Sequence, residues 1–116
     1  MTNAIEPQKW PEFLSGFSIR NHGRRARFEV FGPRGNVGEE VQEAKFDSAS
    51  MDDGIITIKR TYNTGTKDRV MVDKFQNIRG IAVQYDTDRS EVMLELTNNK
   101  AVMTVLHFES MVDGDS

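Results

Sequence analysis

Cysteine is absent from this chain of 116 residues. The absence excludes a disulfide framework and any thiolate metal site, and it suits a reducing compartment. Long apolar runs are absent too, because no window approaches the roughly 20 apolar residues of a membrane-spanning helix. The first residues lack the basic and apolar segments of a secretory signal. We therefore expect a cytoplasmic protein that does not enter a membrane.

The chain also lacks a large excess of either positive or negative charge. Fifteen Lys and Arg residues stand against 18 Asp and Glu residues, which leaves a net charge of −3. Bulk attraction to nucleic acid or anionic lipid is not expected, so either partner would need a local basic patch. The length predicts a single domain over residues 1–116. Residues 1–9 show no periodicity and residues 112–116 are acidic, and we expect both segments to be flexible tails.

Recognisable catalytic and metal motifs are missing as well. No Gly-x-Ser-x-Gly elbow and no cysteine nucleophile occurs. The two histidines, His22 and His107, are isolated in the sequence and lack the spacing of metal ligands. The sequence therefore predicts no enzyme, no metal and no cofactor.

What the sequence does contain most clearly is a β-hairpin over residues 90–108. Every second residue from Val92 to Leu96 is apolar, which is the pattern of a half-buried strand. Asn98 and Asn99 tolerate positive φ, as a tight two-residue turn requires. The register that follows pairs three apolar couples: Leu96 with Ala101, Leu94 with Met103 and Val92 with Val105. The second strand is apolar on both faces, so we expect it to lie centrally.

One helix is predicted before the strands. Four apolar residues fall at positions i, i+3, i+4 and i+7 and form one stripe of a helix: Trp10, Phe13, Leu14 and Phe17. Pro11 suits the first helical turn, and Gly23 suits the C-terminal cap. Such a stripe needs an apolar surface, and we expect the helix to cover the back of the hairpin's second strand.

Short strands and turns make up the rest. Besides the hairpin, strands are expected at residues 26–31, 40–46, 55–62, 69–72 and 81–85, with loops at 32–38, 47–54 and 63–68. No helical crossover separates these strands, so the sheet must be antiparallel. The predicted fold class is mainly β, with an N-terminal helix packed on a bent sheet of six to seven strands, or on a small barrel or roll.

Four arginines are concentrated where the helix passes into the first strand: Arg20, Arg24, Arg25 and Arg27. Arginine binds phosphate through a bidentate fork, so this cluster is a candidate ligand-binding site. The alternative is a solvated surface with cations placed favourably near a helix C-terminus. The acidic net charge favours that alternative.

The same segment resembles the signature of PilZ-type domains. Those small antiparallel barrels bind cyclic di-GMP through an Arg-x-x-x-Arg segment and an Asp/Asn-x-Ser-x-x-Gly turn. Arg20 and Arg24 match the first motif. The second departs from it, since Ser50 lies three residues after Asp47, and Gly54 lies four after Ser50.

The pattern as a whole resembles a family of small bacterial proteins known as domain of unknown function 5335, over about residues 9–110. The resemblance rests on Trp10-Pro-x-Phe13, Phe17, His22-Gly23, Phe28-x-Val30, Val41-x-Glu-Ala44 and Asn99-x-x-x-Met-Thr104-x-Leu-x-Phe108. It implies a bacterial, cytoplasmic protein and brings no activity, cofactor or catalytic residue.

Two functions remain open from the sequence. The first is a non-catalytic binding or assembly module, with an unknown protein partner or self-association. Five methionines could supply adaptable apolar surface or simply fill the core: Met51, Met71, Met93, Met103 and Met111. The second is a small barrel that binds the phosphate of a nucleotide or RNA through the arginine cluster.

Overall fold

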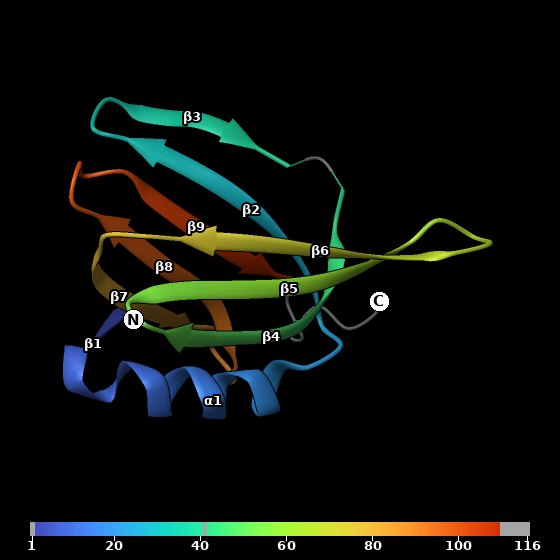
Figure 1. The fold of residues 1–116 in the computed structure, drawn as a ribbon, viewed down its shortest axis with the longest axis horizontal. Helices are drawn as coiled ribbons and strands as arrows, with labels where there is room; N and C mark the ends of the chain where they lie inside the picture. The colour runs from blue at the N-terminus through green and yellow to red at the C-terminus, as the bar shows by residue number, and fades with distance from the viewer. Residues whose placement is uncertain (1, 41, 110–116) are drawn as a thin grey trace.

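The computed structural model describes residues 2–40 and 42–109. In chain order the elements are β1 (Thr2–Ile5), the short 3-10 helix η1 (Pro7–Lys9), α1 (Trp10–Asn21), β2 (Arg25–Gly32), β3 (Gly35–Glu39), β4 (Ala44–Asp52), β5 (Ile55–Asn63), β6 (Asp68–Phe75), β7 (Ile78–Tyr85), β8 (Glu91–Asn98) and β9 (Met103–Phe108) (Figure 1). The fold is mainly β with one N-terminal α-helix, as predicted. Within the described ranges, no helix has the length and apolar character needed to cross a membrane.

The nine strands of the described residues belong to one antiparallel sheet. Its order is β1-β7-β8-β9-β2-β4-β5-β6, and β3 pairs with β2 off this path. The central position predicted for the hairpin's second strand is confirmed, because β9 lies between β8 and β2. The prediction of six to seven strands is wrong, since β1 and β3 were missed. The sheet is also not a closed barrel, because its end strands β1 and β6 do not pair with each other in the described chain.

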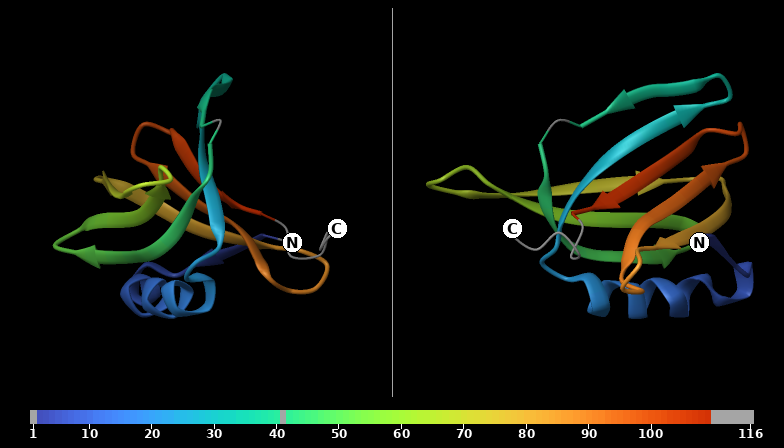
Figure 2. Two further views of the ribbon diagram at one scale, coloured as in Figure 1. Left: turned by 90° about the vertical axis from the view of Figure 1, so that its right-hand side faces the viewer. Right: turned by 180° about the vertical axis from the view of Figure 1, so that it is seen from behind.

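The bend of the sheet originates at β2. Strands β2 and β4 pair only at two residues, where Arg25 faces Lys45 and Ala26 faces Ala44. Beyond that point β2 continues with β3 as its neighbour, from Glu29 to Gly32. The sheet therefore separates into a long wing (β1, β7, β8, β9, β2, β3) and a short wing (β4, β5, β6), as the views in Figure 2 show.

The helix packs where the separation of the wings leaves one edge of β4 without a strand neighbour, while β5 pairs along the other edge. It lies along β4 (Figure 1). Ser18 Oγ accepts a hydrogen bond from the Ala49 N–H at 2.8 Å and lies 2.9 Å from the Ala49 carbonyl oxygen. A helical side chain thus replaces a neighbouring strand at the open edge of β4 and satisfies backbone groups that would otherwise be unpaired.

Aromatic side chains join the helix to both wings. Phe17 of α1 lies 5.6 Å from Phe46 of β4 and 5.5 Å from Phe108 of β9, measured between ring centroids. Phe17 is fully buried together with Leu14, and Trp10 is nearly so, which confirms the predicted stripe. The prediction that the helix covers the back of the hairpin's second strand, β9, is only partly right. The helix lies along β4 and reaches β9 at Phe108. Pro11 in the first turn and Gly23, with φ of 86°, fit the predicted helix ends.

Residues 2–9 do not trail, contrary to the prediction of a flexible tail over residues 1–9. Strand β1 pairs with β7, with Thr2 facing Gln84 and Ile5 facing Ile81. The indole nitrogen of Trp10 donates a hydrogen bond to the Ile5 carbonyl at 2.9 Å, which fixes the chain before the helix. A strand of four residues has too little alternation to be recognised in the sequence. The second predicted tail, 112–116, lies outside the described residues.

The hairpin over residues 90–108 exists, but its predicted register is wrong by three residues. Leu94 faces Leu106, and Leu96 faces Thr104. A shift by an odd number exchanges the two faces of a strand, so Leu106, and not Val105, is the inward partner of the β8 leucines. Leu94, Leu96 and Leu106 are all at most 1% exposed.

The cause is a loop longer than the two-residue turn expected at Asn98-Asn99. The Asn98 N–H donates to the Val102 carbonyl at 2.9 Å, and Ala101 adopts a left-handed φ of 63°. The Asn98 side chain accepts hydrogen bonds from the N–H groups of Lys100 and Val102. Asparagine thus stabilises the loop through its side chain rather than through its tolerance of positive φ.

Two segments predicted as loops are largely strand. The glycine-rich segment 32–38 forms most of β3 and a tight connection to β2, and the segment 47–54 belongs to β4 as far as Asp52. The turn itself is confined to Asp53 and Gly54, which have φ of 52° and 76°. The pairing of β4 with β5 thus outweighs the local preference of these residues for a turn.

We expect Leu94→Ala to lower the free energy of unfolding by about 2–5 kcal/mol, because it leaves a cavity beneath two central strands. The side chain is fully buried. Urea denaturation measures the loss. Val37→Ala is the control, since Val37 is 68% exposed and its truncation should change stability by less than about 0.5 kcal/mol. A loss that small for Leu94→Ala would contradict the inward face assigned to β8.

Candidate functional site

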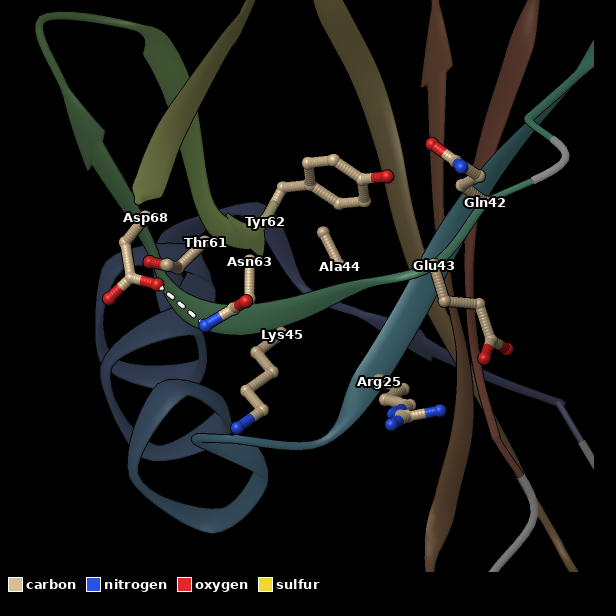
Figure 3. Close-up of a pocket in the computed structure, with 9 residues that line it drawn as sticks. All are labelled: Arg25, Gln42, Glu43, Ala44, Lys45, Thr61, Tyr62, Asn63 and Asp68. Carbon is tan, nitrogen blue, oxygen red and sulfur yellow. Dashed lines mark hydrogen bonds between the residues drawn. The ribbon is translucent and has the colours of Figure 1, made fainter. Parts of the chain in front are cut away.

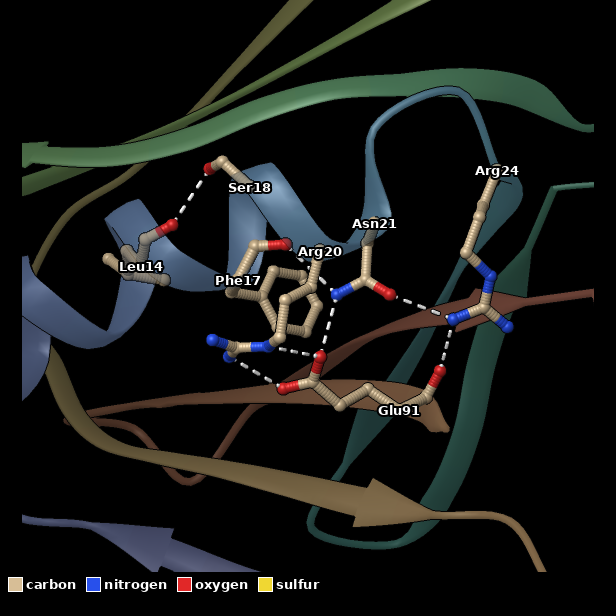
Figure 4. Close-up of polar contacts among 7 residues, drawn as sticks. All are labelled: Leu14, Phe17, Ser18, Arg20, Asn21, Arg24 and Glu91. Atoms are coloured by element: carbon tan, nitrogen blue, oxygen red, sulfur yellow. Dashed lines mark hydrogen bonds and ion pairs between the residues drawn. The ribbon is translucent and has the colours of Figure 1, made fainter. Parts of the chain in front are cut away.

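The structure divides the four arginines of the predicted cluster. Arg20 and Arg24 both bind Glu91 (Figure 4). Arg27 instead forms an ion pair with Glu39 across the β2–β3 hairpin, at 3.0 Å. Arg25 lines a separate depression at the base of the short wing. The four arginines therefore do not form one site, although a single phosphate site made of all four was a candidate from the sequence.

Glu91 is the residue that organises the first pair. Its carboxylate accepts hydrogen bonds from Arg20 Nε and Nη2 and from Asn21 Nδ2, each at 2.9 Å. Its carbonyl oxygen accepts a hydrogen bond from Arg24 Nη1. The residue is only 6% exposed. A buried carboxylate with this many donors is charge-compensated, and it ties the end of α1 to the start of β8.

A β-bulge explains why sequence reasoning missed Glu91. Gln84 faces Met93 and Tyr85 faces Glu91, so Val92 is the extra residue between them. The bulge breaks the alternation of β8 and turns Glu91 to the inner side. Simple alternation from Leu94 assigns Glu91 to the outer face. The one available signal was an acidic residue next to an Asp-rich turn, which does not indicate burial.

The two arginines respond differently to this environment. The hydrogen bond to Glu91 raises the pKa of Arg20, whose side chain is 51% exposed. Burial lowers the pKa of Arg24, and the charge of Glu91 opposes that effect. Arg24 also donates to Asn21 Oδ1 at 2.8 Å and lies 4.7 Å from the Phe108 ring centroid. Both guanidinium groups stay cationic, but Arg24 is mainly a structural cation.

A cleft of about 490 Å³ opens beside this network. Three arginines line it, because Arg89 of the β7–β8 turn joins Arg20 and Arg24. The rings of Phe13 and Tyr85 line it as well. Arg89 has a left-handed φ of 71°, which directs the turn. The cleft therefore combines cations with aromatic surface, beside the compensating carboxylate of Glu91.

The acidic turn next to the cleft is held by its own hydrogen bonds. Asp88 Oδ1 accepts hydrogen bonds from the hydroxyl and the N–H of Ser90, at 2.5 and 2.9 Å. These bonds lower the pKa of Asp88, and the positive charge of Arg24 contributes to the same effect. The negative charge of this exposed turn therefore lies close to the arginines and offsets part of their attraction for an anion.

A second buried ion cluster ties the short wing to the long wing. Arg60 of β5 is 1% exposed and donates to the two Glu40 carboxylate oxygens at 2.7 and 3.0 Å. Its guanidinium lies 4.3 Å from the Phe28 ring centroid and 3.5 Å from Asp73 Oδ2. Glu40 also accepts the Phe28 N–H at 2.8 Å. These contacts close the space between β2 and β5, beyond the point where β2 and β4 diverge.

Glu40 makes this tie sensitive to pH. Partial burial raises its pKa, but the hydrogen bonds from Arg60 and from the Phe28 N–H outweigh that effect, and the pKa lies below the usual 4.5. A carboxyl group whose pKa is lowered in the folded state stabilises the fold above its unfolded pKa. That contribution is lost as the pH falls below 4.5.

We therefore expect Glu40→Gln to unfold at lower urea concentration than the parent at pH 7. Its stability should also decrease less than that of the parent between about pH 6 and pH 3, because one linked carboxyl is gone. Urea midpoints at several pH values measure both effects. Glu12→Gln, an exposed position on α1, is the matched control and should keep the parental pH dependence. A parental pH dependence in Glu40→Gln would contradict the role of the tie.

The other polar residues do not converge on one point. A depression of about 430 Å³ is lined by Arg25, Lys45, Glu43 and Asp68 among others, and their charged ends point in different directions (Figure 3). His107 Nε2 lies 2.8 Å from Glu29 Oε1, on adjacent strands. Within residues 2–40 and 42–109, no group of three or more His, Cys, Asp or Glu side chains is placed to hold a metal ion.

The remaining distinctive surface is the free edge of β6. This strand ends the sheet, and β5 is its only strand neighbour in the described chain. Among the described residues, large apolar side chains are exposed at four positions, Ile19, Val37, Val70 and Val72, and the last two lie on β6 with 63% and 49% exposure. An open edge with exposed apolar side chains is typical of proteins that accept a further strand. The sequence predicted a strand at 69–72 but not its place at the edge.

No protein-family model, no curated protein and no solved structure matches this chain. The resemblances to domain of unknown function 5335 and to PilZ-type domains therefore stay predictions. The function has to be argued from the residues themselves.

Proposed function

We propose that this protein is a non-catalytic interaction module that binds a protein partner by strand addition at β6. The observation that carries the proposal is the free edge of β6 with Val70 and Val72 exposed on one face. Strand addition supplies main-chain hydrogen bonds, and the exposed side chains supply specificity. The lack of cysteine and the stated family resemblance support a bacterial cytoplasm as its location.

The interior charges support association over catalysis. Arg60 and Glu91 are the most buried ionisable side chains of the described residues, and each is bonded to groups of opposite charge. A general acid or base has to exchange a proton with a substrate. Arg60 and Glu91 instead hold the wings and the helix together, so these two side chains have a structural role.

A photo-reactive residue can test the strand-addition edge. Benzoylphenylalanine at position 72 should form adducts in a cell lysate, because a strand added to β6 would contact that position. Position 59 is the matched control, since Lys59 faces Val72 from β5 and is exposed on the same surface, one strand or about 5 Å further from the edge. Mass spectrometry identifies the adducts. Equal labelling at both positions, or none at position 72, would contradict the proposal.

A second candidate function uses the arginine cleft. Arg20 and Arg89 offer a phosphate group its donors, Arg24 adds positive charge to the lining, and the rings of Phe13 and Tyr85 offer a base its stacking surface. The ligand would be a nucleotide or the phosphate of RNA. Arg25 and Arg27, which were part of the predicted cluster, lie outside this cleft.

Calorimetric titration at low salt with cyclic di-GMP and with a short single-stranded RNA tests this second candidate. Arg89→Ala should weaken binding by about tenfold and flatten its salt dependence, because it removes one charged donor. Arg25→Ala is the control and should bind as the parent does. Absence of heat with both ligands would reject the cleft as a nucleotide site.

A further inference from the structure

We infer that the partner at β6 is a second copy of this chain, and that two β6 strands pair antiparallel about a twofold axis through Met71. The inference rests on the proposed strand-addition function and goes beyond it by naming the partner and the register. Three facts carry it: the open edge, the geometry of antiparallel pairing and the order of charges along β6.

Geometry restricts how a strand can pair with its own copy. In an antiparallel pair, facing residues either both direct their N–H and C=O groups across the interface or both direct them away. These groups alternate along a strand, so facing residues of two identical strands must both be odd-numbered or both be even-numbered. The pairing is therefore always centred on a single residue that faces itself.

A centre at Met71 makes the two copies of β6 complementary. Reading outwards, each residue meets a suitable partner: Val70 faces Val72, Arg69 faces Asp73 and Asp68 faces Lys74 of the second copy. Every charge from residue 68 to residue 74 thus meets the opposite charge, and every apolar residue meets an apolar one. Because the twofold axis repeats each pair, both kinds of charge pair occur twice.

The other permitted centres are mismatched. A centre at Val70 places Arg69 opposite Met71, and a centre at Val72 places Met71 opposite Asp73. Centres at Arg69 or Asp73 place a charge opposite its own copy, and like charges that face each other across strands are destabilising. The order of residues in β6 therefore selects one register among the possible ones.

Exposure of the β6 side chains agrees with this register. Asp68, Arg69 and Lys74 are exposed, and Val70 and Val72 are 63% and 49% exposed. Alternation places both valines on one face, so the valines of two copies would form a continuous apolar strip bounded by Asp68–Lys74 pairs. Charges on an edge normally discourage a foreign strand. Here the same charges would favour one partner, which is an identical strand.

Reversal of single charges tests the register directly. Asp68→Lys places Lys opposite Lys74, and Lys74→Asp places Asp opposite Asp68, each at two symmetry-related positions. An equimolar mixture of the two variants restores opposite charges at every one of these positions. The mixture should therefore associate although neither variant does so well alone. A merely sticky edge would not show this reciprocal rescue.

Sedimentation equilibrium of the full chain is the measurement, from about 1 μM to about 1 mM protein, the range in which small interfaces associate. The parent mass should rise with concentration from 13.2 kDa towards twice that value. Each single variant should associate about tenfold more weakly or worse, and the mixture should recover the parental affinity. A parent that stays monomeric, or a mixture no better than its components, overturns the inference. Thermal melts confirm that the variants are folded, since Asp68 also accepts a hydrogen bond from Asn63.

An engineered disulfide provides a second, charge-independent test. In Met71→Cys the two thiols would face each other with Cα atoms about 4.5–5.5 Å apart, within disulfide reach. In Val70→Cys they would be offset by two residues, about 8 Å apart and out of reach. The chain has no other cysteine. Oxidation should therefore cross-link the first variant and not the second, and equal cross-linking would refute the Met71 centre.

The outcomes separate this inference from the proposed function. If the purified protein stays monomeric while position 72 still forms adducts with another protein, a second copy is not the partner. Strand addition at β6 would then still be supported. A protein that stays monomeric and forms no adducts at position 72 would contradict both the self-pairing and the strand-addition function.

Discussion

Strand β2 is the constraint on which the rest of the structure depends. One of its edges pairs with β9, and its other edge is shared between β4 at the start and β3 at the end. Because β4 must leave β2 after two pairs, the sheet divides into two wings and cannot close into a barrel. The division leaves one edge of β4 to the helix, where Ser18 binds Ala49. It also leaves β6 as the last strand of the short wing.

A sheet divided in this way needs ties between its parts, and the buried charges provide them. Arg60 and Glu40 bridge β5 to the segment after β3, and Glu91 joins the end of α1 to β8. Breaking such a pair leaves a charge buried without compensation, so both partners are retained together. The same requirement explains why the four arginines of the candidate phosphate site do not act together. Arg24 serves the fold, and Arg20 is shared between the fold and the cleft.

Local patterns in the sequence were sufficient for the helix and for most strands, whereas long-range features were not. The stripe from Trp10 to Phe17 and the alternation of Leu94 and Leu96 depend on neighbouring residues and were read correctly. The register of β9, the bulge at Val92 and the edge position of β6 depend on pairing with distant segments. Among these features, the bulge has the largest effect on prediction of the site. Alternation with a period of two assigns Glu91 to the outer face, whereas the bulge places it on the inner side. The exposed Arg25 and the half-buried Arg27 could not be separated from Arg20 and Arg24 until β2 was placed.

The segment from Asp68 to Lys74 can indicate its own pairing partner once it is known that β6 is an edge strand. In a central strand its order of charges would have no consequence for assembly, since both edges would already be paired. At an edge, the order Asp-Arg-Val-Met-Val-Asp-Lys is self-complementary about its middle residue. The charges exclude shifted registers, and the two valines provide the apolar contact that charges alone would not supply. An edge strand that must resist unspecific pairing and yet bind one partner can satisfy both requirements with a charge order of this kind.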